Sequence, residues 1–554
     1  MRQHRFGLTL FIGAALGACA AAGPRVTSGA PTSNTGGRDG SFNDADRARQ
    51  AINRLTFGAR PRDLAAVERM GVNAWLDLQL HPERIPDPVA DSVLGLLDIT
   101  NKTAFELAAD HPQANEYGEA IRQMSQIATL GPLRAAATRE LGPSILIRAA
   151  VSDRQLLEVM TSFWENHFSV SADKMPNPFS LVDYDRSIRA HALGKFRELL
   201  GVVATSPAML FYLDNFQSGV DSLHPTVVEW RVEERRRAHP PLGDTSLVHS
   251  VKRRRTGLNE NYARELMELH TLGVDGGYSQ RDVQEVARCL TGWGIDNLIM
   301  GGSFAFQPAT HDAGEKVVLG VHIAGGRGIE DGHEVLDILA RHPSTARFIA
   351  KKLVIHFVSD SAPPALVERV AQTYLRTDGD IRELLRTIVA SAEFNSRAAY
   401  RAKVKTPFEL VASVLRVMNA APDTTQRSVQ VVARLGQPIF GRTTPDGWPD
   451  QGAAWMNAGA LMNRVNLGAQ VGANQVPNTT VARWKAVQQI PEMSPDKVAD
   501  VVINALLTGD TSPATREALL SVRPPPPPST EQQRLGYIGT LVGIAIGSSD
   551  FQRR

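Results

Sequence analysis

Apolar residues recur at helical spacing along most of the chain. From Asp44 onward, hydrophobic positions return every three or four residues in one segment after another, the period of an amphipathic α-helix. The most regular of these predicted helices are Gln155–Phe168, Asp185–Val203, Asn259–Leu272, Arg281–Leu290, His333–Leu339, Thr345–Phe357, Ile381–Ala392 and Pro407–Met418. No repeat recurs at a fixed period, and no linker separates Asp44 from Ser521. The pattern therefore predicts a mainly α protein, with one large multi-helix body over residues 44–520.

Two stretches interrupt the helical pattern. Residues 221–255 combine basic runs at Arg235–Arg237 and Lys252–Arg255 with scattered apolar positions, so we expect a long, exposed basic loop inserted in the body. The segments Ser303–Phe306 and Lys316–His322 flank a turn-rich stretch and together predict one small β-hairpin.

The last residues of the sequence differ in composition from the helical body. We expect residues 521–554 to comprise a stiff proline-rich spacer at Pro524–Pro528, followed by a terminal helix from about Glu531.

The first residues have the order of an export signal. Basic residues precede an apolar run from Phe6 to Leu16, which ends at Leu16-Gly17-Ala18-Cys19, the order of a lipobox. An ordinary secretory signal is the rival hypothesis, and Leu16 fits poorly at its cleavage site. We expect a lipoprotein signal peptide at 1–18, lipidation of Cys19 and a flexible tether at 19–43, rich in Gly, Ser, Thr and Pro.

Charge and cysteine content narrow the function classes. Loss of residues 1–18 removes two arginines from the 60 basic residues and leaves a number equal to the 58 acidic ones, so a basic field that recruits nucleic acid is not expected. With Cys19 lipidated, Cys289 has no cysteine to pair with, and an inert buried thiol is the simpler interpretation. The expected location is the cell envelope, facing the periplasm, at the outer membrane through the lipid anchor.

His167 is the first candidate for chemistry. It shares the apolar face of its predicted helix with Trp164, and an imidazole there must find hydrogen bonds inside the protein. His167 is either a metal ligand or general base in a pocket, or a satisfied core histidine beside a tryptophan.

The predicted helix after Gly257 carries the second candidate group. Asn259 is placed to cap its start and Gly273 to end it, and His270 shares the apolar face. The opposite face carries Asn261, Arg264, Glu265 and Glu268. Because Glu268 and His270 point to nearly opposite sides, they cannot chelate one metal ion from an intact helix. The carboxylate face either forms intrahelical ion pairs with Arg264 or walls a polar pocket.

The third candidate is His311-Asp312 at the expected hairpin tip, followed by Lys316. These residues can supply a base, its orienting carboxylate and a cation, or two metal ligands, and ordinary turn chemistry explains Asp312 equally well. A fourth stretch, Thr443–Trp455, suits either a ligand-facing rim or a loop that caps a core with aromatic mass.

Six blocks of the sequence resemble, in order, the bacterial exported family catalogued as domain of unknown function 1800. They are Asn53–Pro61, Trp164–Phe168, Asn259–Tyr278, Asp282–Trp293, His311–Gly320 and His342–Phe357. The resemblance runs from about residue 46 to 468 and beyond. It implies a helical, exported protein and a periplasmic partner from a second exported family, domain of unknown function 1501, which is similar to sulfatases and phosphatases.

The resemblance also adds weight to the residues at its motif positions. As catalytic candidates it favours His167, Glu265, Glu268, His270, His311 and Asp312. As substrate-binding candidates it favours Trp164, Asn261, Arg264, Arg288 and Trp293.

Two hypotheses about function remain from the sequence. No metalloprotease, Walker, nucleophile-elbow, haem or dinucleotide motif is present, so the reaction itself is not named. The first hypothesis is a cell-envelope enzyme of hydrolase type, in which His167, His270 and His311-Asp312 converge on a pocket that can hold a divalent metal ion. The alternative is a non-catalytic lipoprotein that binds an exported partner protein or an envelope polymer.

Overall fold

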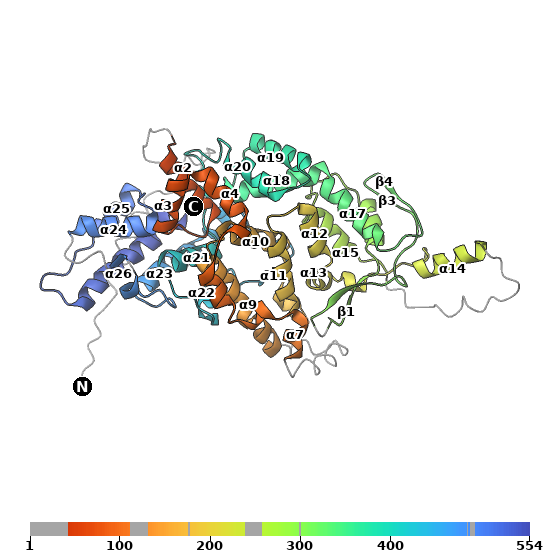
Figure 1. Cartoon of the computed structure of the whole chain (residues 1–554), viewed down its shortest axis with the longest axis horizontal. Helices are drawn as coiled ribbons and strands as arrows, with labels where there is room; N and C mark the ends of the chain where they lie inside the picture. Colours follow the sequence, from red (N-terminus) through yellow and green to blue (C-terminus); the bar gives the residue numbers. More distant parts are fainter. Residues whose placement is uncertain are drawn as a thin grey trace. The chain divides into compact units, whose positions relative to one another are not determined.

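The computed structural model describes residues 42–110, 131–175, 178–238, 257–298, 301–484, 486–487 and 494–554. They belong to one unit, Phe42–Arg554. The predicted signal peptide, Cys19 and most of the tether precede it and lie outside the described residues. The unit consists of helices with two small sheets, which confirms the prediction of a mainly α protein (Figure 1).

The first third of the unit, up to Tyr212, is helical. Its helices are α2 (Asp44–Leu55), α3 (Pro61–Met70), α4 (Val72–Leu80), α5 (Pro88–Leu94), α6 (Asp98–Asn101), α7 (Ala104–Ala109), α9 (Gly131–Val151), α10 (Gln155–His167), α11 (Ser180–His191), α12 (Phe196–Ala204) and α13 (Pro207–Tyr212). The predicted helix Asp185–Val203 is thus two helices, because the chain turns at Gly194, whose N–H donates to the carbonyl oxygen of His191 over 2.9 Å.

The middle of the chain holds both sheets. Its elements are α14 (Val227–Ala238), α15 (Glu260–Glu268), α16 (Gln280–Cys289), β1 (Trp293–Asp296), β2 (Ser303–Phe306), β3 (Lys316–Val318), β4 (Val321–Ile323), α17 (Glu330–Arg341) and α18 (Pro343–Phe357). The predicted hairpin between Ser303–Phe306 and Lys316–His322 is wrong. Instead β1 pairs with β2 and β3 with β4, because Leu319 and Gly320, both at positive φ, close a tight turn within the second segment.

The expected basic loop at 221–255 is in part a helix. Thr226 caps α14, since its Oγ1 accepts from the Glu229 N–H over 3.1 Å while Glu229 Oε2 accepts from the Thr226 N–H over 2.8 Å. Residues 239–256 of the expected loop, with the basic run Lys252–Arg255, lie outside the described residues.

The last third of the chain completes the body. Its helices are α19 (Pro364–Arg376), α20 (Ile381–Val389), α21 (Pro407–Val417), α22 (Gln426–Arg434), α23 (Ala458–Gly472), α24 (Pro495–Leu507), α25 (Pro513–Leu520), α26 (Glu531–Gly547) and α27 (Ser549–Gln552). Short 3-10 turns lie at Pro82–Arg84, Ala172–Lys174, Asn215–Gln217, Gly452–Trp455 and Val481–Arg483. The terminal helix begins at Glu531 as predicted, and it packs side by side with α23 (Figure 1).

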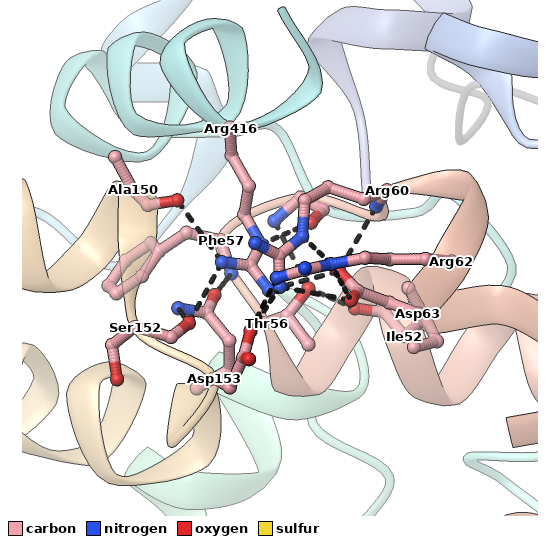
Figure 2. A network of polar contacts seen from close by, with 12 residues as sticks. Ile52, Thr56, Phe57, Arg60, Arg62, Asp63, Ala150, Ser152, Asp153 and Arg416 are labelled. Atoms are coloured by element: carbon pink, nitrogen blue, oxygen red, sulfur yellow. Dashed lines mark hydrogen bonds and ion pairs between the residues drawn. The ribbon is translucent and has the colours of Figure 1, made fainter. Parts of the chain in front are cut away.

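Arg416 on α21 joins segments far apart in the sequence (Figure 2). Its Nε donates to the carbonyl oxygen of Gly58 over 2.8 Å, and its Nη1 donates to those of Ala150 and Ser152 over 3.2 and 3.0 Å. Its Nη2 lies 3.0 Å from Asp63 Oδ2 on α3. Burial lowers the pKa of Arg416 to about 9 against the opposing effect of Asp63. Every donor nitrogen of this buried guanidinium therefore has a partner.

In the part of the chain that the structure describes, no helix combines the length and apolarity needed to cross a bilayer.

Candidate functional site

His167 and His270 lie together inside a shell of aromatic rings. His167 ends α10, and its Nε2 donates to the backbone carbonyl oxygen of His270 over 3.0 Å. The two ring centroids are 6.2 Å apart. Rings that pack against His167 belong to Phe163, Trp164, Phe168 and Phe348. The structure thus brings together two of the predicted histidines, with Trp164 beside them.

Both histidines are closed off from solvent and neutral. His167 is 2 % exposed and His270 is 1 % exposed. Burial lowers the pKa of His270 to about 3, and burial followed by the charge of Lys352 lowers the pKa of His167 well below its usual value. His167 Nδ1 and His270 Nε2 have no partner among the described residues. At neutral pH each of the two rings carries one proton, and its other nitrogen can accept a hydrogen bond.

A pocket lies beside this pair, between the end of α10 and the segment 437–448. It encloses about 510 Å³, counting the space open to solvent. Its lining consists of Ile145, Ser162, Glu165, Asn166, Ser169, Val170, Phe408, Gln437, Pro438, Ile439, Phe440, Arg442 and Trp448. His167 and His270 are not in the lining, so the concave surface is formed by their sequence neighbours on α10.

Asn166 fixes one wall of the pocket. Its Nδ2 donates to the carbonyl oxygen of Trp448 over 2.9 Å, and its Oδ1 accepts from the Trp448 N–H over 2.7 Å. Gly447 has a φ of 74°, and a Cβ there would lie 2.2 Å from the Asn166 carbonyl oxygen, so only glycine fits. The Arg442 guanidinium lies 5.5 Å from the centroid of the Trp448 ring. The pocket therefore has an anchored aromatic rim with a cation against it.

Glu165, which lines the pocket, forms a carboxyl pair with Asp185. Burial raises the pKa of Glu165 well above its usual range, and the charge of Asp185 and a hydrogen bond to it raise that pKa further. Burial alone would raise the pKa of Asp185 too, but Arg189 and Arg148 outweigh burial and lower it. Their guanidinium nitrogens lie 3.2 and 3.6 Å from Asp185 carboxylate oxygens. The surroundings thus favour the protonated form of Glu165 and the ionised form of Asp185.

The carboxylate face of α15 approaches the segment that closes the pocket. Burial raises the pKa of Glu265, and the charges of Glu268 and of Asp446 in that segment raise it further. Burial, Asp446 and Glu265 together raise the pKa of Tyr212 to about 12. Glu268 itself accepts a hydrogen bond from the Tyr278 hydroxyl over 3.0 Å. The negative charges of α15 and of Asp446 thus raise the pKa values of the same group of side chains.

His311 and Asp312 lie in a second, closed cluster, which corrects the expectation of an exposed hairpin tip. Both side chains are 0 % exposed. Asp312 accepts two hydrogen bonds from Arg288, at 2.7 Å from Nε and 3.2 Å from Nη2. Burial would lower the pKa of Arg288, but Asp312 outweighs it and raises that pKa. Arg288, predicted to bind substrate, therefore holds Asp312 instead.

Lys316 and Asp331 complete this second cluster. The Lys316 ammonium lies 2.6 Å from Asp331 Oδ2 and donates to the carbonyl oxygen of Asp312 over 2.5 Å. His311 Nδ1 donates to the carbonyl oxygen of Thr291 over 2.7 Å, and its Nε2 lies 3.4 Å from Asp331 Oδ2. Burial would raise the pKa of Asp331, but His311 and Lys316 outweigh it and lower that pKa. Paired charges explain why these polar side chains are buried.

The remaining predicted residues lie elsewhere. Trp293 is fully buried against Phe304, and a Cβ on Gly332 would lie 2.2 Å from its ring. Asn261 is exposed on the first turn of α15. Arg264 donates to Gln280 over 2.8 Å and lies 3.8 Å from the carboxylate of Glu260, four residues earlier on α15, so it forms an intrahelical ion pair.

No three His, Cys, Asp or Glu side chains are placed to hold a metal ion together within the described ranges. The predicted convergence of three histidines is realised as one pair, His167 and His270, with His311 in the second cluster.

The carboxyl pair escaped the sequence analysis, although a signal for it was present. Glu158 and Glu165 are two helical turns apart on a helix that is otherwise rich in apolar residues, and Asp185 and Arg189 are one turn apart on the next. Charged residues at helical spacing on two neighbouring apolar helices indicate a buried ion network. Asn166 had no signal of its own, since its partner Trp448 is remote in the sequence.

Comparison with known proteins identifies the family. The model of the family described as "Protein of unknown function (DUF1800)" matches residues 50–553. The chain belongs to this family. The match includes the terminal helix α26 and the proline-rich segment before it, which the sequence analysis set apart from the body. Searches of curated proteins and of solved structures each returned no match.

Proposed function

We propose that this DUF1800 protein is a cell-envelope hydrolase with a lipid anchor at Cys19, and that the pocket beside Glu165 is its reaction site. One observation carries the proposal. A carboxyl group whose pKa is raised well above its usual range lines a concave surface and lies beside a second carboxyl group, Asp185, whose pKa is lowered. A pair of titratable groups whose surroundings push their pKa values apart is the usual arrangement for general acid–base work.

The geometry divides the work between the two carboxyl groups. Glu165 gives its proton to the leaving-group oxygen of a bound ester or glycoside, and a water molecule supplies the hydroxyl that completes hydrolysis. The proton released by that water returns to the carboxyl pair. Arg148 and Arg189 keep Asp185 ionised, so that the pair holds one proton and not two.

The rim of the pocket supports a polar substrate with a flat face. Trp448 offers an aromatic surface on which a sugar ring can stack, and Arg442 adds a positive charge near an anionic substituent. Since the pocket is small, it accommodates one unit of an envelope polymer at a time.

The alternative, a non-catalytic lipoprotein that binds an envelope polymer or an exported partner of the DUF1501 family, has one observation in its favour. His311 and Asp312 are fully buried with their partners, and His167 and His270 are closed to solvent, so these polar groups hold helices in register. In that hypothesis the same pocket binds without turnover.

The test compares two glutamates of the same helix. Glu165→Gln keeps the shape of the side chain but removes the acid, whereas Glu158→Gln changes a neighbour that pairs with Arg189 and does not line the pocket. The purified chain lacking residues 1–18 is offered chromogenic glycosides, esters and phosphate esters, and fragments of envelope polymers. Turnover that falls at least about 100-fold in Glu165→Gln but not in Glu158→Gln supports the hydrolase.

The outcomes separate the two functions. If polymer fragments or a DUF1501 protein bind the wild type but no substrate is turned over, the alternative holds. Unchanged turnover in Glu165→Gln contradicts the assignment of the reaction site. A pH profile whose basic limb moves in Glu165→Asp distinguishes an acid from a merely structural residue.

A further inference from the structure

Arg54 on α2 is a buried cation that lacks a carboxylate partner. Its side chain is 0 % exposed, and its Nη2 donates to the backbone carbonyl oxygens of Val358, over 3.0 Å, and Ala399. Its Nε and Nη1 are buried and have no hydrogen-bond partner among the described residues. A guanidinium stays protonated in proteins, so this side chain carries a full positive charge into the core.

A second buried guanidinium lies against Arg54. Arg554 is 4 % exposed, and its Nη1 donates to the backbone carbonyl oxygen of Arg54 over 3.3 Å. Its Nη2 lies 2.7 Å from Glu409 Oε1, whereas its Nε is buried without a partner within the described residues. Burial, and then the charge of Arg554, lower the pKa of Arg54 well below its usual value. Two like charges are thus held together with three N–H donor nitrogens unused.

Three other cations of this neighbourhood have a carboxylate partner, whereas buried Lys405, near Arg554 and Glu409, makes no ion pair among the described residues. Lys403 pairs with Asp360, Lys352 lies 3.8 Å from Asp450, and Arg554 pairs with Glu409. His356 next to Arg554 is neutral, since burial and the charges of Arg554, Lys403, Arg54 and Lys352 lower its pKa well below the usual value. After these pairs are made, Arg54 keeps a positive charge without a counter-charge in the described residues, and Lys405 near Arg554 adds to the excess of positive charge.

We propose that Arg54 and Arg554 form a buried binding site for one small monovalent inorganic anion, with chloride as the representative ligand. The unpaired N–H donors supply its hydrogen bonds, and its negative charge offsets part of the excess positive charge around Arg54. A water molecule can satisfy the donors but leaves the charge uncompensated, which is costly in an interior of low dielectric constant. A larger organic anion does not fit, because the unpaired nitrogens are closed to solvent.

The site adds a ligand-dependent connection between α2 and the last residue of the described unit. Arg54 is on α2, while Arg554 is held by Lys403, whose N–H donates to the Arg554 carbonyl oxygen over 3.2 Å. An anion between the two guanidinium groups stabilises the folded chain by mass action, because the unfolded chain has no such site.

The experiment measures thermal unfolding of the chain lacking residues 1–18 at constant ionic strength, with sodium gluconate replaced stepwise by sodium chloride. We expect the melting temperature to rise with chloride and to saturate, as one binding site requires. The increment should vanish in Arg54→Met and in Arg554→Met. Arg416→Met is the matched control, since Arg416 is equally buried but has a partner for each donor nitrogen (Figure 2). It should lose stability yet keep the chloride increment.

Two outcomes overturn the proposal. A melting temperature that does not respond to chloride, or a chloride increment that survives unchanged in both Arg54→Met and Arg554→Met, means that no anion binds between these residues. If Arg54→Met does not fold, crystals of the wild type soaked in sodium bromide decide the matter, since an anomalous peak against Arg54 and Arg554 is expected. Absence of that peak contradicts the site.

Discussion

Gly472 and Gly539 bring the backbones of α23 and α26 into direct contact. A Cβ added to Gly472 would lie 2.1 Å from the carbonyl oxygen of Gly539, and one added to Gly539 would lie 2.3 Å from that of Gly472. One turn along, a Cβ on Gly468 would lie 2.5 Å from the carbonyl oxygen of Gly543. The two helices pack this closely only because both backbones lack side chains at the crossing.

Gly472→Ala should therefore destabilise the protein by about 2 kcal/mol or more, because the helices must separate to admit a methyl group. Urea unfolding monitored by circular dichroism measures the loss. Gly536→Ala on α26 is the control, since a Cβ there meets nothing within 4 Å, and alanine should leave the stability unchanged or raise it by up to about 1 kcal/mol. Equal effects of the two substitutions would contradict the close crossing.

Asp312→Asn should cost about 3 kcal/mol, because it removes the buried carboxylate that pairs with Arg288 through two nitrogens and leaves that guanidinium with Glu285 alone, 2.9 Å away. Glu260→Gln tests the opposite case, an exposed pair in which the Arg264 and Glu260 charged groups lie 3.8 Å apart, and should cost less than about 1 kcal/mol. Chemical denaturation of both variants gives the comparison. An Asp312→Asn variant as stable as the wild type would show that this cluster does not hold the fold.

Glu165 should make the protein less stable as the pH rises. Its pKa is raised above the usual 4.5, so the folded chain keeps a proton that the unfolded chain loses. The contribution of Glu165 to the free energy of unfolding is fully present below pH 4.5. It is lost as the pH rises through the pKa that Glu165 has in the folded chain. Glu165→Gln cannot lose a proton, so the melting temperature of the wild type relative to this variant should fall between pH 5 and pH 8. A constant difference would mean that Glu165 is not protonated in the folded state.

His270 should act in the opposite direction, at acid pH. Its pKa is lowered from 6.5 to about 3, so the unfolded chain takes up a proton that the folded chain refuses. The contribution of His270 to the free energy of unfolding is fully present above pH 6.5. It falls as the pH drops towards 3, by at most about 1.4 kcal/mol per pH unit. His270→Asn should reduce this slope, whereas His322→Asn, at a side chain that is 60 % exposed, should not. Proton titration followed by NMR should show the His270 ring neutral at pH 5.

Local signals predicted most of the fold. Helix periodicity located α10 and α15, and Asn259 caps α15 as expected, with its Oδ1 2.9 Å from the Asn261 nitrogen. Local signals failed where neighbours in space decide. The β2 strand could pair with a segment on either side of it in the sequence. The tight turn at Leu319-Gly320, which divides Lys316–His322 so that β3 pairs with β4, was not recognised. α14 was missed because its arginines suggested a loop, although Thr226 and Glu229 carried a capping box.

The candidate site was predicted only in part. Spacing placed His167 and His270 on apolar faces, and the structure brings the two together. Spacing could not show that Glu165 meets Asp185, because that contact depends on how α10 packs against α11. The helical spacing of charged residues on the two helices indicates that an ion network is present, but it does not show which carboxyl groups meet.

The contacts of Arg554 join segments that are far apart in the order of synthesis. Its guanidinium reaches the carbonyl oxygen of Arg54, and its backbone pairs with Lys403 in both directions, the N–H of each residue donating to the carbonyl oxygen of the other. The surroundings of α2 are therefore incomplete until residue 554 has left the ribosome. Because this contact joins residues 500 positions apart, closing it costs much chain entropy, so the surroundings of α2 should be among the last parts of the fold to form.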